Sequence, residues 1–268
     1  MKQSWSHIFA MFMRYSYLHK RSIPRAFEIA FWPVMELLVW GFVSLYIQQV
    51  AHGALSKIIV FLINAMIFWD ILYRSQQAIA LSFVQDVWTQ NIINILVTPL
   101  RIWEWIVAAF IYGFVKILII LIILSVLALG LYNFNLIETQ GLYLIPMSLN
   151  LLLFGGSVGL ITSSLILRWG LAAEALIWGV PFLLQPISAV FYPLSILPPW
   201  LQVIAMGLPS TYIFEGMRTI VKEGSLSLDY LLLPFFLNIF YFIVSALIFL
   251  WMYRQAQIHG RLSKLGMD

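Results

Sequence analysis

Cysteine is absent from the 268-residue chain, and charged residues are scarce, at 10% of the total. The lack of cysteine excludes disulfides, thiol chemistry and sulfur-ligated metals. A soluble domain carries about 25% charged residues, so the shortage of charge argues against an ordinary water-soluble class. The formal net charge of +4 is scattered over distant segments, and we expect no nucleic-acid partner.

Motifs for catalysis and cofactor binding are also missing. No glycine-rich loop ends in Gly-Lys-Ser or Gly-Lys-Thr, so the chain lacks a Walker-type cradle for phosphates. No Gly-x-Ser-x-Gly elbow is present. The histidines stand far apart, without metal-ligand spacing: His7, His19, His52 and His259. We therefore predict no catalytic, cofactor-binding or metal-binding residues and expect this chain not to be an enzyme.

Apolar residues dominate instead, at 62% of the chain, with a mean hydropathy of +0.94. A helix needs about 20 mostly apolar residues to cross a bilayer. Six stretches approach or exceed that length: 27–48, 57–74, 103–131, 142–167, 172–192 and 230–253. The sequence thus predicts an all-α polytopic membrane protein with six transmembrane helices. Residues 1–268 would form a single transmembrane domain.

The N-terminal residues 1–25 are too polar to cross a membrane, but apolar side chains recur at helical spacing at Trp5, Ile8 and Phe12. That pattern is typical of an amphipathic helix lying at the membrane interface. Lys2 and Arg14 interrupt the stretch, so we expect no cleaved signal peptide.

Lys and Arg are unevenly distributed between the two ends of the predicted spans. With the N-terminus in the cytoplasm, the 15 basic residues all lie on the cytoplasmic side except Lys57, Lys116, Arg218 and Lys222. Because cytoplasmic segments carry the excess of Lys and Arg, we predict that both termini and residues 80–98 are cytoplasmic. Residues 193–229 would then be external.

Prolines break the chain repeatedly after the fifth apolar stretch. Proline lacks an N–H and clashes with the preceding turn, so it cannot continue a helix. We predict that residues 193–229 leave the hydrocarbon, turn and dip back, as an external re-entrant segment after the fifth span. Its marker residues are Tyr192, Pro193, Pro198, Pro209, Glu215 and Arg218.

Between the second and third apolar stretches, residues 80–98 mix bulky apolar side chains with amides and are followed by Pro99. Since proline tolerates only the start of a helix, we predict that a short cytoplasmic helix ends there and the third span begins. One interpretation is a plain helical hairpin with an interfacial tryptophan. A second interpretation, a coupling element that contacts a partner protein, comes from the resemblance of this stretch to a known family.

These two stretches resemble the permease subunits of type 2 ATP-binding-cassette (ABC) transporters. The resemblance covers nearly the whole chain, and its most specific parts are Thr98-Pro99-Leu100, Phe191-Tyr192-Pro193, Leu197-Pro198, Trp200-Leu201-Gln202, Leu208-Pro209, Thr211-Tyr212 and Glu215 through Arg218. It implies a non-catalytic membrane subunit of an ATP-driven exporter in the bacterial cytoplasmic (inner) membrane. Residues 80–98 would be the region that couples the permease to an ATPase.

The same resemblance implies partners. Two copies of a separate ABC ATPase would bind ATP and magnesium, and a second permease copy would complete a homodimer that forms the substrate pathway among membrane lipids. By position, the residues that contact the ATPase would be Gln85, Asp86, Val87, Trp88, Thr89, Gln90 and Asn91. No motif identifies the substrate.

Ionisable residues within apolar spans are costly and are often functional. Glu36 lies near the middle of the first predicted span and Lys116 near the middle of the third, whereas Glu28 and Asp70 lie nearer the cytoplasmic ends. Each carboxylate is either a buried group that fixes helix packing or a polar group facing a substrate path, and Glu36 is the candidate pathway residue. Gly155, Gly159 and Ser163 recur at every fourth position, a spacing that allows close helix packing.

Two other function classes stay open. A secondary transporter or channel would show inverted repeats or several charged residues at mid-membrane depth, and we find no repeat. A membrane-embedded enzyme would need polar catalytic groups that converge at one interface, and the sequence shows no such convergence.

Overall fold

The computed structural model describes residues 2–50, 58–260 and 262, and every regular element within them is a helix. In chain order the α-helices are α1 (Lys2–Lys20), α2 (Ile23–Val50), α3 (Ile58–Trp88), α4 (Ile92–Leu96), α5 (Ile102–Tyr132), α6 (Leu136–Gln140), α7 (Leu144–Trp169), α8 (Leu176–Ile187), α9 (Pro199–Met206), α10 (Pro209–Glu223) and α11 (Asp229–Ile258). Short 3₁₀ turns lie between them: η1 (Gly141–Tyr143), η2 (Gly170–Ala173) and η3 (Leu194–Ile196).

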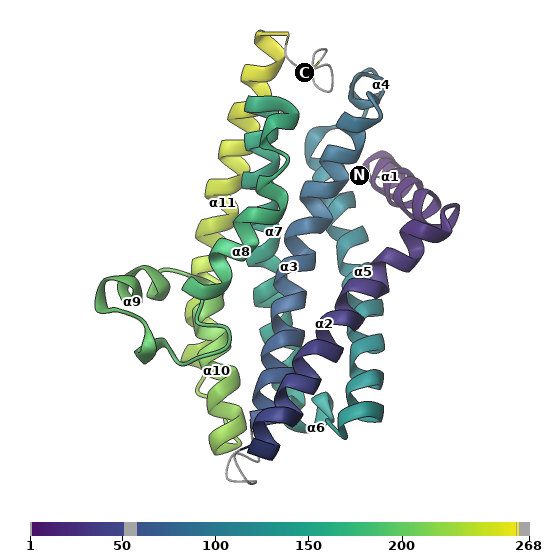
Figure 1. Cartoon of the computed structure of the whole chain (residues 1–268). Helices are drawn as coiled ribbons and strands as arrows, with labels where there is room; N and C mark the ends of the chain where they lie inside the picture. The colour runs from purple at the N-terminus through teal and green to yellow at the C-terminus, as the bar shows by residue number, and fades with distance from the viewer. Residues whose placement is uncertain (1, 51–57, 261, 263–268) are drawn as a thin grey trace.

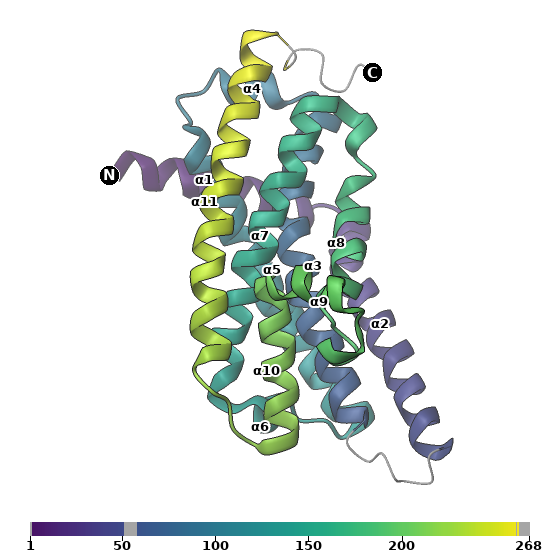
Figure 2. The same ribbon diagram turned by 90° about the vertical axis from the view of Figure 1, so that its left-hand side faces the viewer.

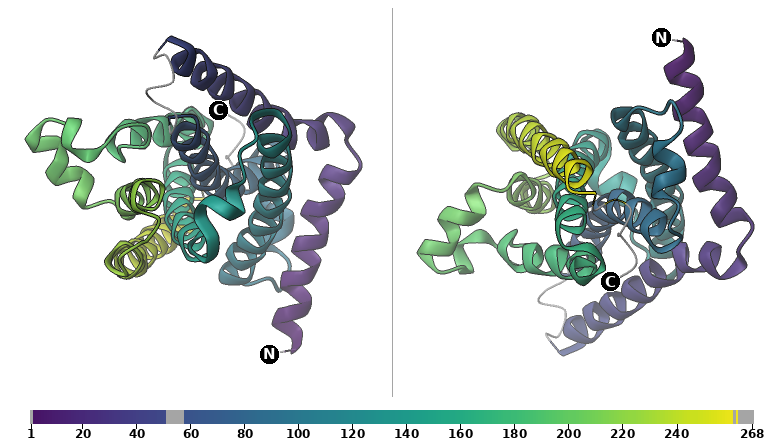
Figure 3. Two further views of the ribbon diagram at one scale, coloured as in Figure 1. Left: turned by 90° about the horizontal axis from the view of Figure 1, so that it is seen from below. Right: turned by 90° about the horizontal axis from the view of Figure 1, so that it is seen from above.

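The long helices α2, α3, α5, α7 and α11 run lengthwise and form an elongated bundle (Figures 1 and 2). We call its two ends the α4 end and the α6 end. Helix α1 and the last turns of α11 lie toward the α4 end, whereas the start of α11 lies at the α6 end. Helix α1 lies across the bundle rather than along it (Figure 3).

Four helical stretches are long and apolar enough to cross a membrane: Ile29–Val50, Ile102–Tyr132, Leu136–Ala173 and Asp229–Ile258. Their outer faces are apolar too, since side chains such as Ile122 and Phe236 are more than 60% exposed. A soluble monomer rarely exposes apolar patches of such extent. The described residues therefore have the helical architecture of a membrane protein.

Helix α3 is as long as α5 but more polar, with Asp70, Arg74 and Asp86 along it. The second apolar stretch was predicted to end near Arg74, but the helix itself continues without a break to Trp88, so the first residues of the predicted 80–98 linker are helical. The last turns of α3 bury Ile79 and Phe83 in the core that packs against α1 and α5. Burial by distant segments thus keeps the polar half of α3 helical.

The fifth predicted stretch, 172–192, is also not one continuous helix. It comprises part of η2, then α8, which ends at Ile187 after two internal prolines. Ala189 then adopts a left-handed φ of 53°, a conformation that ends a helix. Helix α10 begins at the level where α8 ends and runs on toward the α6 end, while α9 lies to one side (Figures 1 and 2).

The amphipathic pattern predicted at the N-terminus forms α1. Ile8, Met11 and Tyr15 are buried against the bundle, whereas Trp5 and Phe9 are exposed. Helix α1 therefore has apolar side chains packed on the protein and others that point outward. Outward apolar side chains of this kind suit a helix at the membrane interface.

Small residues bring α3 and α7 into close contact. A methyl group added at Gly155 would lie 2.4 Å from the carbonyl oxygen of Leu72, and one at Gly159 would lie 2.6 Å from that of Gln76. The glycines of the predicted small-residue stripe thus face α3 within the chain. The Ser163 hydroxyl bonds to its own helix at Gly159.

Candidate functional site

A cavity of about 560 Å³ lies among α2, α3, α5 and α8. Along α3 it is lined from Tyr73 to Trp88, a length of roughly 22 Å at the rise of an α-helix. The cavity therefore follows the half of α3 nearer the α4 end. Its volume is within the range of about 300–1,000 Å³ that is common for small-molecule sites.

Charged side chains from three helices meet at this cavity. Glu36 of α2, Arg74 of α3 and Lys116 of α5 all line it. Asp70, one turn before Arg74, is 2% exposed and accepts a hydrogen bond of 3.1 Å from the Arg74 Nε. The charge of Glu36 interacts with the charges of Asp70 and Arg74. The charge of Lys116 interacts with that of Asp70. Two acids and two bases thus form one cluster inside the bundle.

The structure places Glu36 and Lys116 on the same cavity, which the sequence left undecided. Asp70 lies near the middle of α3, because α3 extends beyond the predicted stretch 57–74. The side chain of Glu28 lies outside the described residues. The sequence did not point to Arg74 or to the cavity residues Trp178 and Phe182 as site residues. For Arg74 there was a signal, because Asp70 and Arg74 are four residues apart and so share one helix face.

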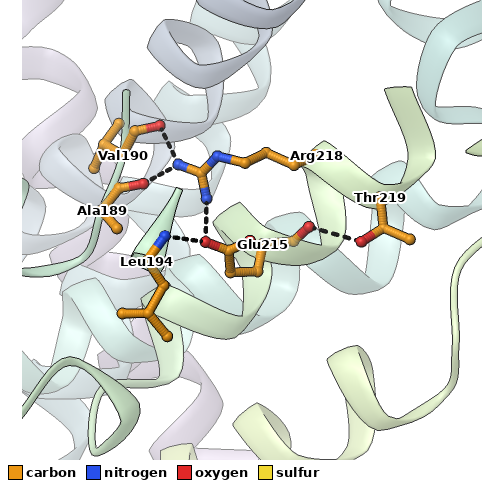
Figure 4. Close-up of polar contacts among 6 residues, drawn as sticks. All are labelled: Ala189, Val190, Leu194, Glu215, Arg218 and Thr219. Carbon is orange, nitrogen blue, oxygen red and sulfur yellow. Dashed lines mark hydrogen bonds and ion pairs between the residues drawn. The ribbon is translucent and has the colours of Figure 1, made fainter. Parts of the chain in front are cut away.

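A second polar cluster joins the end of α8 to α10 (Figure 4). The Arg218 Nη2 donates to the carbonyl oxygens of Ala189 and Val190, the latter at 3.0 Å. Its Nη1 donates to Glu215 Oε1 at 2.9 Å, and the same oxygen accepts the backbone N–H of Leu194 at 2.6 Å. Arg218 is only 4% exposed. A buried cation therefore satisfies carbonyls left without helical partners where α8 ends.

Burial lowers the pKa of the Arg218 guanidinium, while the neighbouring Glu215 carboxylate acts to raise it. Arginine side chains are not deprotonated in proteins. The role of the guanidinium in this cluster is to bind carbonyl and carboxylate oxygens together rather than to transfer a proton.

The other predicted marker residues lie along the same junction. The Tyr192 hydroxyl donates to the Pro186 carbonyl oxygen at 2.8 Å. Pro193 and Pro198 are the residues just before η3 and α9, and Pro209 is the first residue of α10, positions that proline tolerates. The Ser188 and Ser210 hydroxyl oxygens are 2.7 Å apart, so the chain returns at Ser210 to the point it left at Ser188.

The predicted coupling residues occupy the last turn of α3 and the turn after it. Asp86 and Val87 are buried inside the chain, whereas Trp88, Thr89 and Gln90 are exposed, and Gln85 and Asn91 are half-buried. Asp86 forms an ion pair with Arg14 of α1. Burial raises the pKa of the Asp86 carboxyl, and the hydrogen bond from Arg14 opposes that rise.

Two further contacts hold this end of the bundle. The Trp88 Nε1 donates to Glu174 Oε2 at 3.0 Å, which links the end of α3 to the segment between η2 and α8. Glu104 is buried at the start of α5, where its Oε2 accepts the Arg101 N–H at 2.9 Å and lies 3.0 Å from the His7 Nδ1. The exposed tip between α3 and α4 therefore lies next to a set of polar contacts that join α1, α3, α5 and the α7–α8 connection.

Among the residues that the structure describes, no group of three His, Asp or Glu side chains is placed to hold a metal ion. Neither the protein-family models nor the curated proteins include a match to this chain. The features of this chain that bear on its function are the cavity, the α8–α10 junction and the exposed tip between α3 and α4.

Proposed function

We propose that this chain is the transmembrane permease subunit of an ATP-driven ABC exporter in the bacterial cytoplasmic membrane. It would work as a homodimer with two copies of a separate ATPase, which bind ATP and magnesium. Both termini and the α4 end would face the cytoplasm, and the α6 end would face outward. Helix α3 and the segment 172–192, which contains α8, would complete the set of six spans with the four apolar stretches.

One observation carries the proposal: the chain between Ser188 and Ser210 leaves the bundle and returns to the same point. Irregular backbone at membrane depth is tolerated only where other groups satisfy it. Here Arg218 and Tyr192 supply those bonds. This geometry is what a re-entrant segment after the fifth span needs, and the marker residues of the resemblance are the ones that build it.

The tip between α3 and α4 supports the same proposal from the other end of the bundle. An element that transmits movement from an ATPase needs an exposed contact surface on a stiff base. Trp88, Thr89 and Gln90 supply exposed side chains, and the Arg14–Asp86 ion pair supplies part of the base. Since Asp86 and Val87 are buried, the ATPase would contact the remaining five of the seven coupling residues.

Affinity purification from the native host tests the proposal. The tagged chain, extracted in mild detergent, should bring with it a separate chain that contains a Gly-Lys-Ser or Gly-Lys-Thr loop and hydrolyses ATP. Trp88→Ala should reduce its recovery, because truncating a central aromatic at an interface costs about 2 kcal/mol or more. Reduced recovery could follow from the loss of the aromatic ring or from the loss of the hydrogen bond to Glu174. Trp88→Phe separates these two causes, since it keeps an aromatic ring but removes the hydrogen bond.

Trp251→Ala is the matched control, since Trp251 is an exposed tryptophan near the end of α11. It should leave ATPase recovery unchanged. If no ATPase accompanies the wild-type chain, or if Trp88→Ala and Trp251→Ala behave alike, the proposed coupling is wrong.

A secondary transporter is the second candidate, and two observations favour it. The break between α8 and α10 resembles the discontinuous helices that form mid-membrane sites in such transporters. The cluster of Glu36, Asp70, Arg74 and Lys116 places several charges inside the bundle. Uptake or release driven by a proton gradient in vesicles that contain only this chain would favour this candidate over the ABC exporter.

A further inference from the structure

Arg74 presents a hydrogen-bond donor that the protein does not use. Its side chain is 10% exposed, and its Nε is bonded to Asp70. Its Nη2 is buried and has no hydrogen-bond partner among the described residues. Leaving a buried charged donor without an acceptor is costly. Arg74 is also one of the residues that line the cavity, so an anionic group bound there would lie beside its guanidinium.

A second cation and two amides line the same cavity. Lys116 approaches from α5, and Gln77 and Gln85 lie further along α3. Asp70 is already engaged by Arg74, so Glu36 is the acid of this cluster that lines the cavity itself. The donors of Arg74, Lys116 and the amides suit an oxyanion, since guanidinium and ammonium groups bind phosphate and carboxylate oxygens strongly.

Aromatic side chains supply the rest of the lining. Trp32 of α2 is 55% exposed, and Trp178 and Phe182 of α8 are 41% and 56% exposed. These rings lie on the helices that flank the cavity, where an apolar chain can pack against them. The cavity thus offers positive charge and hydrogen-bond donors on α3 and α5, and aromatic surface on α2 and α8.

We propose that this cavity binds an anionic amphiphile, with its phosphate or carboxylate group at Arg74 and Lys116 and its apolar part against Trp32, Trp178 and Phe182. Glu36 weakens the binding of an anion and so limits its affinity. That such a molecule is the exported cargo rests on the proposed function. The binding itself requires no ATPase.

The test uses the purified full-length chain in an uncharged detergent, without ATPase. Isothermal titration calorimetry compares hexyl phosphate, inorganic phosphate and hexyltrimethylammonium. Hexyl phosphate should bind more tightly than either of the other two, since only it offers both an oxyanion and an apolar chain. Lys116→Gln should weaken hexyl phosphate binding by at least about tenfold, as expected for the loss of one charge-assisted hydrogen bond. Glu36→Gln should strengthen it.

Two further variants keep the result interpretable. Lys222→Gln, an exposed position on α10 away from the cavity, should leave binding unchanged. The paired variant Asp70→Asn with Arg74→Gln removes both partners of the ion pair, so no buried charge is left alone. It should abolish binding while the chain still unfolds cooperatively on heating.

Several outcomes would overturn the inference. Tighter binding of hexyltrimethylammonium would mean that the site selects cations. Equal affinities for inorganic phosphate and hexyl phosphate would mean that the apolar chain contributes nothing to binding, which contradicts the proposed contact with the aromatic side chains. Equal behaviour of Lys116→Gln and Lys222→Gln would place the anion elsewhere. Because no ATPase is present in these titrations, their failure is distinct from failure of the proposed function, which depends on ATPase recovery.

Discussion

At the scale of single residues, a few polar side chains form hydrogen bonds between helices. Asn238 donates to both the backbone oxygen and the side-chain oxygen of Asn150 at 2.9 Å. Gln76 bonds to Thr162 between α3 and α7. An apolar surround makes an unpaired polar group costly, so paired groups fix how the helices meet. Among the described residues some buried polar atoms still have no hydrogen-bond partner, and of these only the Arg74 Nη2 belongs to a residue that lines the cavity.

Arg218 is the residue whose loss should cost most at the α8–α10 junction. Arg218→Gln would leave Glu215 without its cation and the carbonyls of Ala189 and Val190 without their donor. Removing one partner of a buried ion pair costs about 3–5 kcal/mol, so the melting temperature in detergent should fall clearly. Arg218→Lys should have an intermediate effect, because an ammonium group lacks the planar fork that reaches all three oxygens.

Lys222→Gln on the same helix is the control for Arg218. Lys222 is exposed, and exposed substitutions usually change stability by no more than about 0.5 kcal/mol. Equal melting temperatures for Arg218→Gln and Lys222→Gln would mean that the carbonyls at the end of α8 find other donors.

At the scale of elements, the contact between α3 and α7 depends on glycine. Gly159→Ala would place a methyl group 2.6 Å from the Gln76 carbonyl oxygen, so the two helices would have to move apart. Overpacking of this kind costs about 1–3 kcal/mol. The variant should melt at a lower temperature in detergent than the wild-type chain, which thermal unfolding measures.

Gly130→Ala in α5 separates packing from helix propensity. Apart from its own stretch of helix, no atom of the described residues lies within 4 Å of a methyl group added at Gly130, and alanine is favoured over glycine in a helix by up to about 1 kcal/mol. This variant should be as stable as the wild-type chain or slightly more stable. A destabilisation as large as that of Gly159→Ala would argue against close packing as the cause.

The sequence predicted the long apolar helices well because their length and hydrophobicity are local properties. It failed for the end of α3, because residues 80–88 were predicted to belong to a linker but are helical. Asp86 in this part of the helix is paired with Arg14, which comes from a distant part of the chain, so only the folded structure shows why this polar residue can be buried in a helix.

Parts of the candidate site could likewise be predicted from the sequence, and other parts could not. Glu36 and Lys116 stood out in the sequence because they interrupt apolar stretches. Whether they share a cavity depends on how α2 and α5 are rotated about their axes, which composition does not determine. The prolines of the α8–α10 junction marked a break correctly, but the bond between Ser188 and Ser210, which closes the excursion, has no local signature.

At the scale of the whole molecule, the basic residues are arranged asymmetrically along the bundle. Arg14 on α1, Arg101 before α5 and Arg168 near the end of α7 belong to segments toward the α4 end (Figures 1 and 2). Lys222 lies near the end of α10, at the α6 end. A cytoplasmic α4 end agrees with the excess of Lys and Arg in cytoplasmic segments.

The absence of cysteine allows this orientation to be measured directly. Ser225→Cys places a thiol in the exposed connection between α10 and α11, and Val97→Cys places one between α4 and α5, where Val97 is 79% exposed. A membrane-impermeant maleimide applied to intact cells should label Ser225→Cys and not Val97→Cys, since only the α6 end would face outward. After the membrane is permeabilised, both should react, which serves as the accessibility control. The reverse pattern would place the tip between α3 and α4 outside the cell, where no cytoplasmic ATPase could contact Trp88. That result would contradict the proposed ABC exporter.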